Sequence, residues 1–260
     1  MDSKTLSVLE WGKVIERLVA EAATRVGKDR CQAIEFHTDL DGVSHALRLT
    51  TEADALIRIT GGFPLGGIRD IRQALRRVEQ GADLDGPDLL AIADTMDAAR
   101  RIKAFMAEHA EAVPAFAELA VPVTPLPKLV AEIKRCFDLS GELADDASPA
   151  LQTIRQRIRQ AQSGIREKLQ RMLNTHAPHL QESLITVRGD RFVLPVRSDA
   201  KSQVPGLVHD QSASGSTLYI EPMAVVELNN SLSKARLDER DEIARILERL
   251  TQLVLADLEE

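Results

Sequence analysis

Apolar residues recur every three or four positions along most of this chain, which is the spacing of amphipathic helices. Up to Phe137, glycines and prolines repeatedly interrupt this pattern, and both residue types end helices. The first part of the chain is therefore predicted to consist of helices joined by short loops. The predicted helical segments are residues 3–35 with a break near Gly27, a segment from Asp39 or Asp41 to about Ile59, residues 68–80, and Pro87 to about Glu111.

A long helix is predicted to begin at Ser148-Pro149, because serine followed by proline is typical of a helix start. It should end before Pro178. Its apolar positions follow steps of three and four residues, as in the seam of a coiled coil. These positions are Leu151, Ile154, Ile158, Ala161, Ile165, Leu169 and Met172. Gly164 lies beside the one irregular step, where we expect a close packing contact or a bend, since a mid-helix glycine costs about 1 kcal/mol relative to alanine.

A second long helix is predicted from Met223 or Ala224 to the last residue. Its apolar positions are Leu228, Leu232, Ala235, Ile243, Ile246, Leu250 and Leu253. No glycine, proline or capping residue ends it at Glu260, so we expect the polypeptide to be a fragment cut within a helix. The two long helices are predicted to pair as antiparallel, coiled-coil-like rods.

The apolar period changes from helical to alternating in residues 184–222. Residues 184–188 and 191–197 predict a hairpin, because Gly189-Asp190 suits a two-residue turn. Pro195 predicts that its strand lies at an edge or a bulge, since proline cannot donate a ladder hydrogen bond. Two further short strands are predicted over residues 207–209 and 217–221. A polar loop, residues 198–203, and a Ser/Gly-rich loop, residues 210–216, complete this part.

These patterns predict a mainly α fold. We expect a helical core over residues 1–147, a first long helix over 148–175, a small inserted β-containing tip segment over 176–225, and a second long helix over 226–260.

Composition is that of a folded protein, with 44% hydrophobic and 28% charged residues. No run of about 18 apolar residues predicts a membrane span. Met1-Asp-Ser-Lys4 does not resemble the start of a secretory signal, so a cytoplasmic location is expected. The net charge of −7 is uneven, because residues 151–201 carry ten Lys/Arg and only four Asp/Glu. Nucleic-acid binding is therefore expected only locally.

The first long helix carries six cations and one acid between Arg155 and Arg171. The cations are Arg155, Arg157, Arg159, Arg166, Lys168 and Arg171. One interpretation is a solvated face that pairs with acids of the second long helix, such as Glu239, Asp241, Glu242 and Glu248. The other is a secondary basic face for nucleic acid.

Four cations in the tip segment have few acids beside them in sequence and are the preferred phosphate contacts. They are Arg188, Arg191, Arg197 and Lys201. Aromatic residues are scarce, with six Phe, one Tyr and one Trp, so binding by base stacking is not expected.

The chain contains no convincing catalytic or metal-binding motif. Gly61–Gly67 lacks the Lys-Ser/Thr of a phosphate-binding loop, and His209, Asp210 and Ser212 are too close in sequence to converge as a triad. His176 and His179 have no further ligand nearby for a metal. No catalytic residue, cofactor or metal is expected in this chain.

Several segments together resemble a known family. The most specific is His209-Asp-Gln-Ser-Ala-Ser-Gly-Ser-Thr-Leu-Tyr-Ile-Glu-Pro-Met-Ala-Val-Val-Glu-Leu-Asn-Asn230. Pro64-Leu-Gly-Gly-Ile-Arg-Asp-Ile71, Leu90-Ala-Ile-Ala-Asp-Thr95, Ala147-Ser-Pro149 and Arg191-Phe-Val-Leu-Pro-Val196 add to it. The chain resembles the N-terminal half of the bacterial type-two MutS paralogues, the branch with a C-terminal Smr nuclease domain.

The resemblance implies that residues 148–175 and 226–260 are the two arms of a lever and that residues 176–225 are a clamp that grips a nucleic-acid backbone. It also implies that an ATPase domain, which uses ATP and Mg, and the Smr nuclease domain lie beyond Glu260. The whole protein is implied to be a homodimer. Family members are implicated in suppressing recombination, cleaving branched DNA and splitting collided ribosomes.

Two functions remain open for the chain itself. The first is a non-catalytic clamp and lever that binds duplex or branched DNA, or the ribosome, without reading sequence. The second is a dimerisation or structural module that does not bind nucleic acid.

Overall fold

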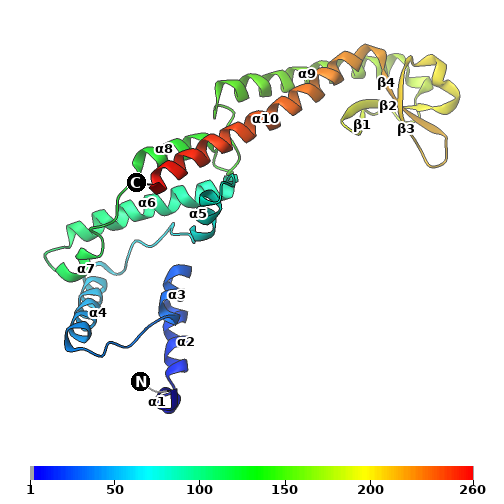
Figure 1. The fold of residues 1–260 in the computed structure, drawn as a ribbon. Coiled ribbons are helices and arrows are strands. Elements are labelled where there is room, and N and C mark those ends of the chain that lie inside the picture. The colour runs from blue at the N-terminus through cyan, green and yellow to red at the C-terminus, as the bar shows by residue number, and fades with distance from the viewer. Residues whose placement is uncertain (1–2, 260) are drawn as a thin grey trace. The chain divides into compact units, whose positions relative to one another are not determined.

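The computed structural model describes residues 3–259, so Met1, Asp2 and the expected helix at Glu260 lie outside the described part. The chain forms two compact units, which we describe separately: residues 1–143 with 247–260, and residues 144–246. Figure 1 shows the order of the elements along the chain. The fold is mainly α with one small antiparallel sheet, as predicted. The finer four-part division stays a prediction.

The first unit is built from helices. They are α1 (Ser3–Val8), α2 (Trp11–Glu21), α3 (Arg25–Gln32), α4 (Leu40–Thr60), α5 (Arg72–Glu79), α6 (Gly86–Glu108), α7 (Pro114–Glu118), α8 (Pro127–Cys136) and the last part of α10 (Met223–Glu259). Asp39, and not Asp41, caps α4, accepting a 2.6 Å hydrogen bond from the Gly42 N–H. Gly61–Gly67 lies in the connection between α4 and α5, as predicted.

The prediction that a helix begins at residue 68 is wrong, because α5 begins only at Arg72. The backbone N–H of Arg69 instead donates a 2.9 Å hydrogen bond to the Thr95 hydroxyl of α6. This long-range bond competes with the first turn of a helix, which sequence pattern alone does not reveal.

Buried side chains of α4, α6 and the residues on either side of α7 form a core in the first unit. The cluster comprises Leu56, Met106, Val113 and Ala120, packed against Phe63, Phe105 and Phe116. The last part of α10 belongs to the same unit, where the buried Thr251 hydroxyl accepts a 3.0 Å hydrogen bond from the Leu84 N–H.

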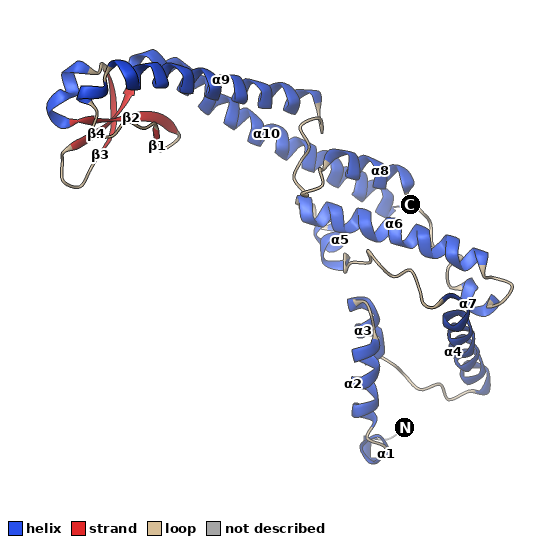
Figure 2. Ribbon diagram, turned by 180° about the vertical axis from the view of Figure 1, so that it is seen from behind, coloured by secondary structure: helices blue, strands red, loops and turns tan. Residues whose placement is uncertain are grey.

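Two long helices run side by side in the second unit, as Figure 2 shows: α9 (Pro149–Thr175) and the first part of α10. Ser148 caps α9 as predicted, accepting a 3.0 Å hydrogen bond from Leu151, and its hydroxyl donates to Glu242 at 2.7 Å. At the other end of α9, Lys168 Nζ lies 3.0 Å from the Ala224 carbonyl. Early residues of α9 thus meet late residues of this α10 segment, so the two helices are antiparallel.

Gly164 occupies a packing contact within this helix pair. A Cβ atom built on it would lie 3.6 Å from Leu228 Cδ1 of α10. This is an ordinary van der Waals distance, so the contact with Leu228 does not by itself require a glycine.

A four-stranded antiparallel sheet completes the second unit, in the order β1-β2-β4-β3. Its strands are β1 (Thr186–Arg188), β2 (Arg191–Arg197), β3 (Gly206–Gln211) and β4 (Thr217–Pro222). The predicted hairpin is confirmed, with Gly189 at φ 55° in its turn. The short 3-10 helices η1 (Ala177–His179) and η2 (Ser198–Gln203) lie in the same unit. A 3-10 helix thus occupies residues 198–203, where a polar loop was predicted.

The prediction that the strand of Pro195 lies at an edge or bulge is also wrong, because β2 pairs with both β1 and β4. Pairing with β1 stops at Val193, however. The Pro195 carbonyl faces the side away from β4 and accepts a 2.9 Å bond from Gln181. Since N and O of a strand residue point the same way, the missing N–H removes no bond to β4.

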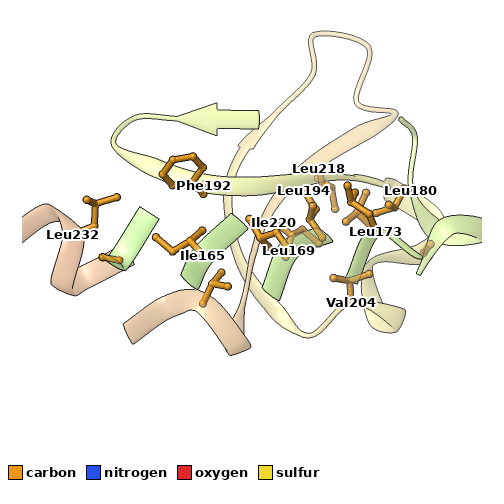
Figure 3. Packing of buried hydrophobic residues seen from close by; sticks show 14 residues of the cluster. Ile165, Leu169, Leu173, Leu180, Phe192, Leu194, Val204, Leu218, Ile220 and Leu232 are labelled. Atoms are coloured by element: carbon orange, nitrogen blue, oxygen red, sulfur yellow. The ribbon is translucent and has the colours of Figure 1, made fainter. Parts of the chain in front are cut away.

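The sheet and the helix pair share one hydrophobic core (Figure 3). Ile165, Leu169 and Leu173 come from α9, Phe192, Leu194 and Val196 from β2, Leu218 and Ile220 from β4, and Val225 and Leu232 from α10. The tip segment is therefore packed onto its helices rather than tethered by loops.

Candidate nucleic-acid interface

The structure places Arg188 on the edge strand β1, where its side chain already has four partners. Within β1, its Nη1 donates to the Thr186 hydroxyl at 3.3 Å and to the Val187 carbonyl at 3.0 Å. Its Nε lies 3.2 Å from a carboxylate oxygen of Asp210, and its guanidinium carbon lies 3.8 Å from the centre of the Tyr219 ring. The stacking leaves one face of the guanidinium covered and fixes its orientation. A phosphate would have to compete with Asp210 for this group.

Arg191 begins β2 and points inward rather than toward solvent. Its Nη1 lies 3.3 Å from Glu221 and 2.6 Å from the Asn230 side-chain oxygen. Glu221 is buried, with a side chain only 1% exposed. Because a buried carboxylate needs a compensating charge, Arg191 has a structural role that competes with phosphate binding.

Arg197 and Lys201 lie at and after the end of β2. Arg197 binds Asp199 through two hydrogen bonds of 3.1 and 2.6 Å. The hydrogen bond lowers the pKa of Asp199 and raises that of Arg197, but the pair is exposed, so it adds little stability. Lys201 is exposed on η2 and makes no ion pair with any residue of the described range.

The expectation of few acids around these four cations is wrong. Residues 176–225 contain five acids, and three of them pair with the arginines. Of these four cations, Lys201 forms no ion pair with a carboxylate within residues 3–259. Among the three arginines, Arg197 has the most exposed side chain.

The structure also reveals a buried polar network that the sequence analysis missed. Glu221 at the end of β4 accepts hydrogen bonds from His209 at 2.5 Å and from the Asn229 amide at 2.7 Å, beside its contact with Arg191. His209 lies in a bulge of β3, between the pairs Val208–Ile220 and Asp210–Tyr219. The bulge re-aims this side chain toward Glu221.

Asn229 of α10 connects this network to β2. Its side-chain oxygen accepts from the Phe192 N–H at 3.2 Å, and its amide donates to the Phe192 carbonyl at 3.1 Å. One helix side chain thus pairs with a strand residue as a neighbouring strand would. The signals in the sequence were an acid inside an apolar strand and an Asn-Asn pair within a helix.

The basic side chains of α9 divide into two groups. Arg155 binds Glu239 of α10 at 2.9 Å, so the predicted pairing with the second helix is confirmed for this residue. Arg155 and Arg159 also both bind Asp145, at 2.8 and 2.7 Å, which lowers the pKa of that carboxyl. Glu242, one of the expected acids, binds Ser148 and Arg245 instead.

The remaining α9 cations have no carboxylate partner among the residues the structure describes. Lys168 bonds to the Ala224 carbonyl, and Arg171 lies 3.4 Å from the Glu167 carbonyl. Arg157 and Arg166 form no ion pair within that range. Their charges are therefore available to an anionic partner.

Two other features bear on chemistry. Within residues 3–259, no three His, Cys, Asp or Glu side chains are grouped so as to hold a metal ion. No helix of the described range combines the length and apolarity needed to cross a bilayer.

Comparison with known proteins gives a single, consistent result. Proteins named Endonuclease MutS2 match from Symbiobacterium thermophilum (42% identity over 258 residues), Pelotomaculum thermopropionicum (42% over 253) and Brevibacillus brevis (42% over 258). The matches cover 99%, 96% and 98% of this chain. Over nearly its whole length the chain is homologous to MutS2. No family model matches it.

The chain spans about a third of the length of these MutS2 relatives, since the same matches cover 32%, 32% and 33% of them. The resemblance found in the sequence is thereby confirmed at the level of the family.

Proposed function

We propose that this chain is the non-catalytic clamp and lever part of a MutS2-type endonuclease, and that its tip segment contacts the backbone of nucleic acid without reading sequence. In this proposal α9 and α10 are the lever arms and the sheet is the clamp. The names of the relatives support a nucleic-acid partner. The main structural support is the shared core, which makes the sheet a rigid end-piece of two long helices.

Lys201, with Arg197 beside it, is the phosphate contact that the local geometry favours most. It is exposed on η2, next to the sheet, with no carboxylate to displace within the described residues. Arg188 is a weaker contact because Asp210 competes, and Arg191 is the weakest because it compensates buried Glu221. The scarcity of aromatic, Asn and Gln side chains in the hairpin of residues 184–197 agrees with backbone contact.

Titration of the chain with duplex DNA, branched DNA and ribosomes at several salt concentrations tests this proposal. Binding should be weak and steeply salt-dependent, and Lys201→Gln should reduce the salt slope by about 0.9 for one lost phosphate contact. Arg240→Gln is the matched control, because Arg240 is an exposed cation of α10. The proposal fails if the parent binds none of these ligands at low salt.

For the whole protein we infer the properties that the family resemblance implies. A separate ATPase domain would use ATP and Mg, an Smr domain would supply the nuclease, and a cytoplasmic homodimer would bring two clamps together. ATP-driven displacement of the lever arms would then move the tips. Suppression of recombination and rescue of collided ribosomes are the two processes to test.

A second candidate function, self-association through the first unit, is favoured by one observation. Leu40, Val43, Leu47 and Ile57 of α4 are exposed apolar residues on one side of that helix. A second copy would cover this apolar side with the same side of its own α4. Sedimentation should then detect a dimer whose stability does not change when DNA is added. Leu47→Glu should abolish this dimer, whereas His45→Glu, on the opposite side of α4, should leave it intact.

A further inference from the structure

An open groove of about 810 Å³ runs between α9 and the β1–β2 hairpin in the second unit. One side of α9 supplies its polar wall: Arg159, Gln162, Ser163, Arg166 and Gln170. Ile185, Val187 and Phe192 supply its apolar floor. Val187 is 46% exposed, so this floor is accessible.

The donors of the wall are largely unengaged. Among residues 3–259, the side chains of Gln162, Ser163, Arg166 and Gln170 form no hydrogen bond or ion pair. Arg159 uses only one of its nitrogens, on Asp145, and stays 57% exposed. Glu167 is the one carboxylate in the lining, and among residues 3–259 it forms no ion pair with either arginine.

Helix geometry arranges these donors in a row. Their spacing of three and four residues keeps them on one side of α9, and Arg159 and Arg166 are two turns apart, about 10 Å. A row of donors above an apolar floor matches a polymer that carries regularly spaced anions on one side and apolar rings on the other.

We propose that this groove binds one sugar–phosphate strand of a nucleic acid, with phosphates on Arg159 and Arg166 and sugars over Ile185 and Val187. The proposal rests on the function proposed above and assigns the strand to the groove rather than to Lys201 alone. Phe192 is buried, so no aromatic platform is available and binding should not depend on base identity.

An acidic peptide fits less well than a nucleic-acid strand. Its backbone N–H and C=O groups would lie over the apolar floor and need partners. The strand edge beside the groove, β1, has only three residues to offer them. A sugar–phosphate strand has no such requirement.

Arg166→Gln and Arg157→Gln form a matched pair, since both residues are exposed α9 cations without an ion pair in the described range and Arg157 lies outside the groove. Binding of labelled oligothymidylate is measured as a function of salt. Arg166→Gln should weaken binding about threefold to tenfold and lower the salt slope by about 0.7, while Arg157→Gln should leave the slope unchanged. Thermal unfolding of both variants checks that the fold is kept.

The outcomes separate the two proposals. If the parent binds neither oligothymidylate nor duplex at low salt, the proposed nucleic-acid function fails. If the parent binds and both variants lose the same amount of affinity for oligothymidylate, binding is diffuse and the groove assignment is overturned. Polyglutamate of equal charge is the competing ligand. If it displaces oligothymidylate from the parent, and if Arg166→Gln binds polyglutamate more weakly than the parent does, the groove is a site for acidic peptides and the proposal is overturned.

Discussion

At the residue scale, Asn229 is the side chain on which the attachment of the sheet to α10 depends most. Asn229→Ala leaves both Phe192 backbone groups without a partner in a buried place and removes one of the two hydrogen bonds to Glu221 Oε1. Each such group costs about 1–3 kcal/mol, so we expect a loss of about 3 kcal/mol in urea unfolding. Asn230→Ala, which removes only an exposed contact with Arg191, should lose about 1 kcal/mol or less. Equal losses would contradict the role assigned to Asn229.

Two glycines of the second unit should respond oppositely to alanine. A Cβ on Gly206 would lie 2.2 Å from the Glu221 carbonyl oxygen, which is backbone and cannot move aside cheaply. Gly206→Ala should therefore destabilise the protein by several kcal/mol or prevent folding, as overpacking does in the extreme. Gly164→Ala meets only ordinary contact with Leu228 and should gain up to about 1 kcal/mol in helix propensity. The midpoint of thermal unfolding of each variant tests both predictions. A lower midpoint for Gly164→Ala than for the parent would contradict the packing described.

At the element scale, α8 is joined to the last part of α10 by a carboxylate whose ionisation matters. Hydrogen bonds from Arg135 and then Arg249 lower the pKa of Glu132 from 4.5 to about 2. Because folding lowers this pKa, the ion pair stabilises the fold above pH 4.5, and the stabilisation is lost as the pH falls toward 2. Glu132→Gln should remove that part of the acid sensitivity. Glu79→Gln, at an exposed position of α5, is the control, and identical acid profiles for the two variants would refute the role of Glu132.

Elements were predictable where local chemistry decides them. Ser148-Pro149 fixed the start of α9, and Gly189-Asp190 fixed the first hairpin, because capping and turn preferences act over a few residues. The start of α5 was not predictable, because it depends on a hydrogen bond to Thr95, far along the chain.

The candidate site divides in the same way. The positions of the tip cations followed from charge pattern, but their partners depend on strand register. Only the pairing of β3 with β4, with its bulge at His209, brings Asp210 to Arg188 and His209 to Glu221. A register slip of one residue would reverse which side chains face the core. Counting acids near a cation in sequence therefore could not reveal which cations are free.

At the scale of the whole molecule, the second unit carries its own core, so it should fold alone. Residues 144–246 contain α9, the sheet and the part of α10 that packs on them, and the cluster of buried residues lies wholly inside this range. Cooperative unfolding of a 144–246 polypeptide is therefore expected, with the nucleic-acid affinity of the full chain retained.

In that polypeptide, Leu169→Ala should cost about 2–5 kcal/mol, because it opens a cavity in the shared core. In the full chain, Leu56→Ala should instead destabilise the first unit and leave nucleic-acid binding unchanged. A 144–246 polypeptide that folds but no longer binds would move the interface into the first unit, whereas one that does not fold would mean that the sheet depends on contacts beyond its own core.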